Sequence, residues 1–296
     1  MGQILNYIKL LRPTNWLKNL FIFLPVFFNG DIFDIHLLLR STFAFISFCF
    51  IASAIYIIND YKDIEKDRCH PVKCKRPLAS GKIKPAIVFP FIVFLVCSSI
   101  GVLFTFHIEE RYKLISIILL YFFLNLAYTF ILKNYAIIDV FIISFGFVLR
   151  IFLGGSATGI ILSPWIILLT FLITLLMAFA KRRDDVIINE KGGTVTRKNT
   201  LSYNLDFMNL VLGILSSISI VCYILYTVSP DVVSRHNGEY IYLTTIFVLA
   251  GILRYLQVTI VNKDSGSPTK ILLHDRFIQF SILAWIVSFL LIIYIK

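Results

Sequence analysis

Long apolar runs separated by short charged connections constrain this chain more than any other feature. A helix needs about 20 predominantly apolar residues to cross a bilayer whose hydrocarbon core is roughly 30 Å thick. The chain is 58% hydrophobic and only 15% charged, which a water-soluble domain of 296 residues would not show. We therefore predict an all-α polytopic membrane protein with nine transmembrane helices, in which residues 1–296 form a single transmembrane domain. The nine predicted spans are residues 16–30, 38–58, 86–106, 114–132, 137–153, 163–180, 207–228, 240–260 and 277–295.

Lysine and arginine are distributed unevenly between the connections. Residues 59–85 carry eight of them and residues 181–206 carry six, whereas residues 31–37 and 154–162 carry none. The positive-inside rule then places the amino terminus and the two charged connections in the cytoplasm, with the spans in the plasma membrane. The net charge of +11 thus comes from charges that flank spans and meet membrane lipids, so no nucleic-acid partner is expected.

Carboxylates occur at helical spacing directly after the predicted span 38–58. If that helix continues, Asn59, Asp63 and Asp67 follow one another at intervals of four residues, with Asp60 beside them. Magnesium takes hard oxygen ligands and usually bridges a few carboxylates to substrate phosphates. We therefore predict that these four residues bind Mg²⁺ together with a diphosphate. The alternative is a solvated loop in which Asp and Lys side chains pair with one another.

Cations follow these acids within the same connection. Residues 70–82 contain several lysines and one arginine, and two prolines restrain the segment. Lysine offers phosphate a point charge, and arginine can bond it with two nitrogens. Lys73 and Arg76 are the predicted phosphate ligands. The alternative is that the cations of this segment only meet the membrane surface.

A second charged segment, Lys181 to Asp185, follows the predicted span 163–180. If this helix neighbours the one that carries the first acids, Asp185 completes the metal site and Lys181 or Arg182 holds a phosphate. The alternative is that these charges anchor the helix end among lipid headgroups.

Ionisable residues also occur inside the predicted spans. Asp139 and Arg150 are eleven residues apart, close to three helical turns, and so share one helix face. Intramembrane charges generally face a partner or a water-filled cavity. Asn125, Tyr128 and Arg254 are expected to line the same cavity. For Asn125 and Tyr128, hydrogen bonding between helices is an equally good explanation.

A resemblance to a known family rests first on the acidic segment. The UbiA superfamily of intramembrane prenyltransferases has a first signature similar to Asn59-Asp60-x-x-Asp63-x-x-x-Asp67-Arg68. The resemblance implies nine transmembrane helices around a central cavity, with two acidic motifs on cytoplasmic loops that bind Mg²⁺ and an isoprenyl diphosphate. The second motif departs from the usual DxxxD, because Asn189 stands four residues after Asp185.

That departure is similar to the branch typified by decaprenyl-phosphate phosphoribosyltransferase, whose second motif is Lys-Arg followed shortly by an acid. The Asp184-Asp185 pair differs from the branch in detail, which leaves open which of the two would bind metal. The further stretches that resemble the branch are Asp67-Arg68-x-His70-Pro71, Lys75-Arg76-Pro77, Val148-Leu149-Arg150, Leu253-Arg254-Tyr255 and Pro268 to Asp275-Arg276.

The resemblance implies an Mg²⁺-dependent enzyme that transfers 5-phosphoribose from 5-phosphoribosyl 1-diphosphate to a polyprenyl phosphate, decaprenyl or undecaprenyl, with release of diphosphate. The residues expected in catalysis are Asp60, Asp63, Asp67, Lys181, Arg182 and Asp185, with Asn59 as a further metal ligand. The residues expected to bind substrate are Arg68, Lys73, Arg76, Asn125, Tyr128, Asp139, Arg150 and Arg254.

Two alternative functions were compared with this assignment. A UbiA-type enzyme that moves an isoprenyl group from its diphosphate to an aromatic acceptor would use the same metal site. A cation transporter is disfavoured, because transport sites lie near the bilayer midplane whereas most acids here lie in connections. The sequence leaves open whether the chain forms a homo-oligomer.

Overall fold

The computed structural model describes residues 2–69, 73–190, 198–236, 240–262 and 268–294, and throughout these stretches the regular structure is helical. Among the described residues, eight helices are long and apolar enough to cross a membrane. They are α3 (Ile35–Lys62), α5 (Val88–Val102), α6 (Ile108–Phe130), α7 (Ile138–Thr158), α8 (Pro164–Glu190), α9 (Leu205–Val228), α11 (Thr245–Leu256) and α13 (Arg276–Tyr294), of which α5 and α11 are extended by short helical turns. The five short α-helices of the described residues are α1 (Gly2–Leu11), α2 (Leu24–Asn29), α4 (Ile64–Arg68), α10 (Pro230–His236) and α12 (Pro268–His274).

The first predicted span is the one that does not form a long helix. Residues 16–30 fall instead on a 3-10 helix, η1 (Pro13–Phe23), and a short helix, α2 (Leu24–Asn29). Pro25 lies at the start of α2, where its missing N–H breaks no helical bond. The segment ends at Gly30, whose φ of 88° suits a residue without a side chain. An all-helical membrane protein is thus confirmed, whereas the count of nine spans is not.

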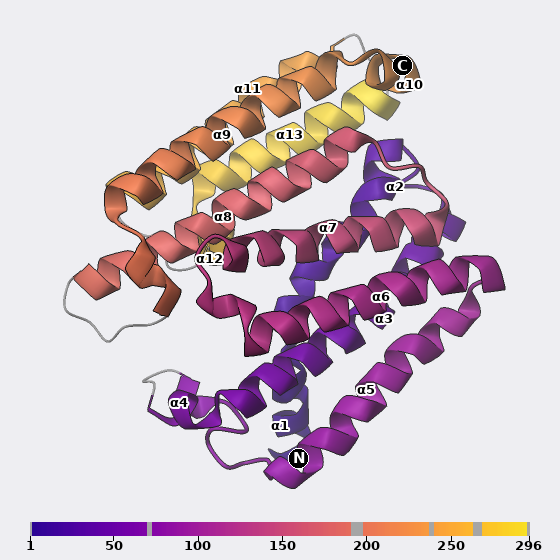
Figure 1. Ribbon diagram of the computed structural model, residues 1–296. Coiled ribbons are helices and arrows are strands. Elements are labelled where there is room, and N and C mark those ends of the chain that lie inside the picture. Colours follow the sequence, from indigo (N-terminus) through magenta and orange to yellow (C-terminus); the bar gives the residue numbers. More distant parts are fainter. Residues whose placement is uncertain (1, 70–72, 191–197, 237–239, 263–267, 295–296) are drawn as a thin grey trace. The chain divides into compact units, whose positions relative to one another are not determined.

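The chain divides into two compact units. Unit 1 consists of Met1–Phe130 and Leu149–Leu162, and unit 2 consists of Ile131–Val148 and Ser163–Lys296. In unit 1, α3 packs along α5 and α6 (Figure 1). The unit 1 core includes Phe48, Ile51, Leu114, Ile118 and Leu153, all buried.

A close backbone approach in unit 1 joins α7 to η1. A Cβ atom added at Gly154 would lie 2.1 Å from the backbone oxygen of Ile22. Only a residue without a side chain allows the two backbones to come this near, as in other helix contacts within membranes.

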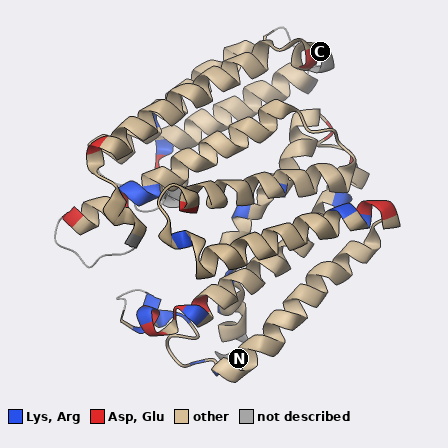
Figure 2. Cartoon of the chain, viewed as in Figure 1, with Lys and Arg blue, Asp and Glu red and all other residues tan. Residues whose placement is uncertain are grey.

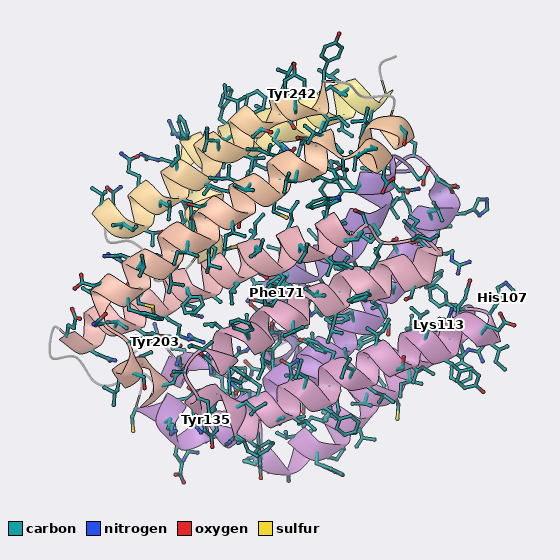
Figure 3. All side chains as sticks on the ribbon, turned by 45° about the horizontal axis from the view of Figure 1, so that its top comes forward. His107, Lys113, Tyr135, Phe171, Tyr203 and Tyr242 are labelled. Carbon is teal, nitrogen blue, oxygen red and sulfur yellow. The ribbon has the colours of Figure 1, made fainter. Side chains whose placement is uncertain are left out.

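Unit 2 is a bundle in which α9 packs against α8 and α11, and α11 packs against α13 (Figure 1). Its core includes the buried side chains of Leu176, Phe179, Met208, Leu212 and Tyr255. Phe171 of α8, labelled in Figure 3, makes an edge contact with Phe141, with ring centroids 5.5 Å apart.

Candidate active site

Two carboxylates and two guanidinium groups form a network in unit 1, which we call the first charged cluster: Arg12, Asp60, Asp67 and Arg76. Arg76 donates from Nη1 to Asp60 Oδ1 at 2.9 Å and to Asp67 Oδ2 at 2.6 Å. Arg12 Nη2 donates to the same oxygen of Asp60. The side chains of Asp60 and Asp67 are only 3% and 5% exposed. Figure 2 shows acidic and basic residues gathered around α4, whereas the bodies of the long helices carry few.

The end of α3 differs from the prediction of one continuous helix. The helix ends at Lys62, and Asp63, with φ −99° and ψ 14°, separates it from α4. Two backbone bonds still hold the turn, from Asp63 N to Asn59 O and from Asp67 N to Asp63 O. The helix therefore continues beyond residue 58 but breaks at Asp63, and Arg76 bridges Asp60 and Asp67 across the break.

Arg12 belongs to this cluster, although sequence reasoning missed it. Ser53 of α3 donates to the carbonyl of Leu11 at 2.9 Å and accepts from the indole of Trp16 at 3.1 Å. Ser53 precedes Asp60 by seven residues, about two helical turns, so the segment that carries Arg12 is fixed along the same helix. Burial lowers the pKa of Arg12, against the opposite effect of the neighbouring Asp60.

The sequence contains little that would identify Arg12 as a site residue. It is an isolated cation between two apolar segments, directly before Pro13. In the structure its φ is 54°, the left-handed region that side chains other than glycine seldom adopt. Such strain is often found at functional sites.

The predicted phosphate ligands of the first connection have different surroundings. Arg76 bonds the two acids, as described above. Arg68 donates from Nε to the carbonyl of Ala79 at 3.3 Å, which helps to close the connection. Lys73 is exposed in a short 3-10 turn. That Arg68 and Lys73 bind substrate stays a prediction.

A second network lies in unit 2, which we call the second charged cluster: Asp139, Arg182 and Asp185. Arg182 donates from Nε to Asp139 Oδ2 at 2.5 Å and from Nη1 to Asp185 Oδ2 at 3.4 Å. The side chains of Arg182 and Asp139 are 1% and 0% exposed. Lys181, one position earlier on α8, is exposed. Asp139, which was predicted to share a helix face with Arg150, forms its ion pair with Arg182.

Arg183 is a buried residue of α8 that sequence reasoning did not single out. It donates from Nε to Asn209 Oδ1 and from Nη1 to the carbonyl of Thr259, each at 2.8 Å. Thr259 lies in a π-helical turn, Gln257–Val261, whose carbonyls are not all used by the helix itself. Arg183 therefore fastens α8 to α9 and to the end of α11.

The turn that leads into α7 is held by a tyrosine from the start of α9. Tyr203, labelled in Figure 3, accepts a hydrogen bond from the backbone N–H of Ile137 at 2.5 Å. Desolvation raises the pKa of the Tyr203 phenol, so it stays protonated. Ile137 has a φ of 67°, and Asp139 follows two residues later.

Arg150 is held inside unit 1. It donates from Nε to Asn19 Oδ1 at 2.9 Å and from Nη2 to the hydroxyl of Tyr121 at 3.5 Å. Its guanidinium lies 4.5 Å from the ring centroid of Phe48. Asn125 donates within its own helix to the carbonyl of Tyr121 at 2.8 Å, which is not the interhelical bond considered above.

Arg254 is committed to an ion pair in unit 2. Its Nε and Nη2 donate to Asp275 Oδ2 at 3.1 and 2.9 Å, and Nη1 donates to Gln257. Asp275 caps α13, because its Oδ1 accepts from the backbone N–H of Ile278 at 3.0 Å. The hydrogen bond from Arg254 holds the pKa of Asp275 below its usual value. The two late stretches that carried the resemblance therefore meet each other, and roles for Arg254, Asn125 and Tyr128 toward a substrate stay predictions.

Comparisons with known proteins agree with the predicted family. A model of the UbiA prenyltransferase family matches residues 20–281. Decaprenyl-phosphate phosphoribosyltransferase of Corynebacterium glutamicum is 33% identical over 290 residues, which are 97% of this chain and 86% of that protein. The protein of the same name from Mycolicibacterium smegmatis is 33% identical over 94% of this chain and 89% of its own length. A solved UbiA homolog from Archaeoglobus fulgidus, bound to DMAPP and Mg²⁺, has a TM-score of 0.69 at 20% identity, over 98% of this chain and 100% of that one.

Proposed function

The chain belongs to the UbiA prenyltransferase family, and on that premise we propose that it transfers 5-phosphoribose from 5-phosphoribosyl 1-diphosphate to a polyprenyl phosphate. The two relatives that bear the name of this activity match nearly the whole chain, which supports the choice of donor and acceptor. The structural observation that supports it best is the convergence of Asp60 and Asp67 on one nitrogen of Arg76.

The first charged cluster suits Mg²⁺ and a diphosphate. Two carboxylates, Asp60 and Asp67, already surround a single cationic nitrogen. Mg²⁺ usually takes one or two carboxylates together with waters and substrate phosphates, so the absence of a group of three metal-binding side chains among the described residues does not argue against it. We assign these two residues to the metal, with Asn59 and Asp63 at the end of α3 as further ligands. When bound there, Mg²⁺ supplies charge neutralisation for the leaving diphosphate.

The arginines of the first charged cluster can serve the same donor. Arg12 and Arg76 compensate the buried charge of Asp60, and a guanidinium also bonds phosphate oxygens in a bidentate manner. We assign both to the diphosphate. The 5-phosphate of the donor needs cations of its own, and we assign it to Arg182 and the exposed Lys181 on α8.

The proposed reaction needs little covalent help from the protein. An oxygen of the acceptor phosphate bonds to ribose C1 while the bond from C1 to the diphosphate oxygen breaks, and the bonding electrons leave with the diphosphate. The acceptor requires no strong base, since a phosphate monoester has a second pKa of about 6 and is largely dianionic at pH 7. The charged residues therefore act by orientation and electrostatic stabilisation. One direct displacement inverts the configuration at C1.

The acceptor phosphate is assigned to Arg150. This cation is 4% exposed inside unit 1, and Asn19 and Tyr121 fix its orientation. An arginine beside apolar helices suits a lipid whose head is a phosphate and whose tail remains in the bilayer. Arg254 is the weaker candidate because two of its nitrogens already bond Asp275.

The proposal includes the orientation of the chain in the plasma membrane. The connections rich in lysine and arginine face the cytoplasm by the positive-inside rule. A water-soluble donor with several phosphates would reach the charged clusters from that side.

A lipid-extraction assay tests the proposed function. Purified protein in detergent is incubated with Mg²⁺, labelled 5-phosphoribosyl 1-diphosphate and decaprenyl or undecaprenyl phosphate, and a parallel reaction receives a labelled isoprenyl diphosphate and an aromatic acid. We expect metal-dependent label in an acid-labile phospholipid. Label that appears only in the aromatic product would overturn phosphoribosyl transfer in favour of prenyl transfer.

A substitution links that assay to the first charged cluster. Asp67→Asn removes one carboxylate with almost no change in volume, and we expect transfer to fall by about 100-fold or more, as when a charge-stabilising group is lost from an active site. Glu109→Gln, which alters an exposed acid in the first turn of α6, is the matched control and should leave the rate unchanged. Full activity of Asp67→Asn would remove this carboxylate from the mechanism.

A further inference from the structure

We propose that Asp139 is a positioning residue of the second charged cluster: it holds Arg182 by its Nε atom, so that the outer edge of the guanidinium is directed toward Asp185 and the phosphates of the donor. The inference rests on the proposed function insofar as Arg182 is taken to bind phosphate. It replaces the expectation that Asp139 itself binds substrate.

Asp139 is the innermost member of the second charged cluster. Its side chain is 0% exposed at the start of α7, and it bonds Nε of Arg182, whose side chain is 1% exposed. Asp185, which bonds Nη1 of the same guanidinium, is the most accessible member, with 16% of its side chain exposed. A ligand would therefore approach the guanidinium from the side of Asp185, and Asp139 acts through Arg182.

The pair is bonded along one edge only. An arginine and a carboxylate commonly form two parallel hydrogen bonds. Here Arg182 Nε meets Asp139 Oδ2, while Oδ1 is buried and accepts no hydrogen bond from the part of the chain that the structure describes. A buried oxygen without a partner lowers stability. This arrangement leaves Nη1 directed toward Asp185 instead of toward the second oxygen of Asp139.

The turn before Asp139 is a second observation that the fold fixes the position of Asp139. Ile137 has a φ of 67°, which is an outlier for a β-branched residue and persists only where the surroundings enforce it. The hydroxyl of Tyr203 accepts the N–H of Ile137, and Asp139 N donates to the carbonyl of Tyr135 at 3.2 Å. Figure 3 labels Tyr135 and Tyr203. The strained turn thus fixes the start of α7, where Asp139 points to Arg182.

The charge of Asp139 has a second effect on Arg182. An arginine that is almost fully buried needs a compensating anion, because desolvation of an unpaired charge is costly. Asp139 supplies that anion on the side away from Asp185. The guanidinium can then remain in place and charged when Asp185 or a phosphate changes its own contacts.

A double-mutant cycle tests the proposal, with inorganic phosphate as the probe. Inorganic phosphate presents the group that is assigned to Arg182 and lacks the ribose and the diphosphate, so the measurement does not require that the proposed donor is correct. The Kd is measured by calorimetry for the wild type, Asp139→Ala, Arg182→Gln and the double variant. Asp139→Asn is added because it keeps an acceptor for Nε while it loses the charge.

We expect Asp139→Ala to weaken phosphate binding by about tenfold, and Asp139→Asn to weaken it less. In the Arg182→Gln background, Asp139→Ala should change the Kd less than about twofold, since a residue that acts through Arg182 has no further effect once Arg182 is gone. Equal weakening in both backgrounds, or none in the wild-type background, would overturn the proposal. If Asp139→Ala does not fold, the same comparison is made with Asp139→Asn.

A control variant and the transfer assay separate this inference from the proposed function. Glu110→Gln breaks a different carboxylate–arginine pair, with Arg40 in unit 1, and should bind phosphate like the wild type. Failure of the wild type to transfer phosphoribose would overturn the proposed function, whereas a coupled loss of phosphate binding would still establish Asp139 as a positioning residue.

Discussion

Asp60 is a nearly buried carboxylate whose charge is shared by two arginines, Arg12 and Arg76. Removal of either arginine leaves the bond from the other arginine to Asp60 in place. The loss of one should therefore weaken the cluster without abolishing it. The partly exposed Arg12 is the easier of the two to replace, since Arg76 also holds Asp67.

Arg12→Ala should therefore destabilise the protein by about 1–3 kcal/mol, the range for a buried polar group that loses one partner. Because Mg²⁺ can take over part of the lost positive charge, we expect added Mg²⁺ to raise the melting temperature of Arg12→Ala more than that of the wild type. Thermal unfolding in detergent with and without Mg²⁺ measures both effects. Lys113→Ala, an exposed cation on α6 that Figure 3 labels, is the control and should match the wild type. A variant whose response to Mg²⁺ equals that of the wild type would contradict the assignment of metal to this cluster.

Asp275 makes stability depend on pH in the acid range. The hydrogen bond from Arg254 lowers the pKa of Asp275 in the folded state, so its carboxylate stabilises the fold at every pH above the unfolded value of about 3.9. That contribution is lost as the pH falls through the lower, folded pKa. We expect the melting temperature of the wild type to fall more steeply below about pH 4 than that of Asp275→Asn, which retains a capping oxygen but cannot titrate. Parallel melting curves from pH 6 to pH 3 would settle the matter, and identical slopes would count against the ion pair.

At the scale of elements, the approach of α7 to η1 connects packing with the proposed acceptor site. Gly154 lets the α7 backbone touch the carbonyl of Ile22, and the same two elements carry Arg150 and Asn19, which bond each other. Any change that separates the elements should therefore disturb the orientation of the arginine.

Gly154→Ala would place the Cβ atom 2.1 Å from the backbone oxygen of Ile22. Either α7 or η1 must therefore move. We expect a loss of about 1–3 kcal/mol in stability, as in overpacked cores, together with a raised KM for the polyprenyl phosphate. Gly213→Ala on α9 is the matched control, since a Cβ there meets nothing within 4 Å and alanine favours a helix. Melting temperatures and acceptor kinetics for the pair test this, and a Gly154→Ala protein as stable as Gly213→Ala would refute the close contact.

At the scale of the whole molecule, the hydropathy and length of the apolar runs predicted the long helices. The contacts between the site residues could be seen only in the folded structure. Eight of the nine apolar runs form helices long enough to span, within the stretches that the structure describes. The exception, residues 16–30, is the shortest run and contains Pro25.

Contacts between residues that are far apart in the sequence could not be predicted from hydropathy and spacing. Arg12 and Asp60 are 48 residues apart, and Asp139 and Arg182 are 43 residues apart. Periodicity within one helix indicates which residues share a face, but it carries no information about which distant side chain meets that face. The ion pair of Asp139 with Arg182 was missed for this reason. The bend at Asp63 was missed because a helical pattern of acids continues across it.

The orientation of the whole molecule can be tested with a native thiol. Cys69 is exposed in the connection that carries eight cations, whereas Cys49, Cys97 and Cys222 lie on membrane-spanning helices. A charged maleimide that does not cross membranes should therefore label the chain in inverted membrane vesicles and leave it unlabelled in intact cells. The control is a Cys69→Ser/Cys74→Ser variant, which should lose the label, because a charged reagent does not enter the apolar part of the membrane to reach the other thiols. Labelling from the outside of intact cells would invert the orientation. It would also place the first charged cluster on the side of the membrane where a cytoplasmic donor is absent, so this one measurement bears on the proposed reaction as well as on the topology.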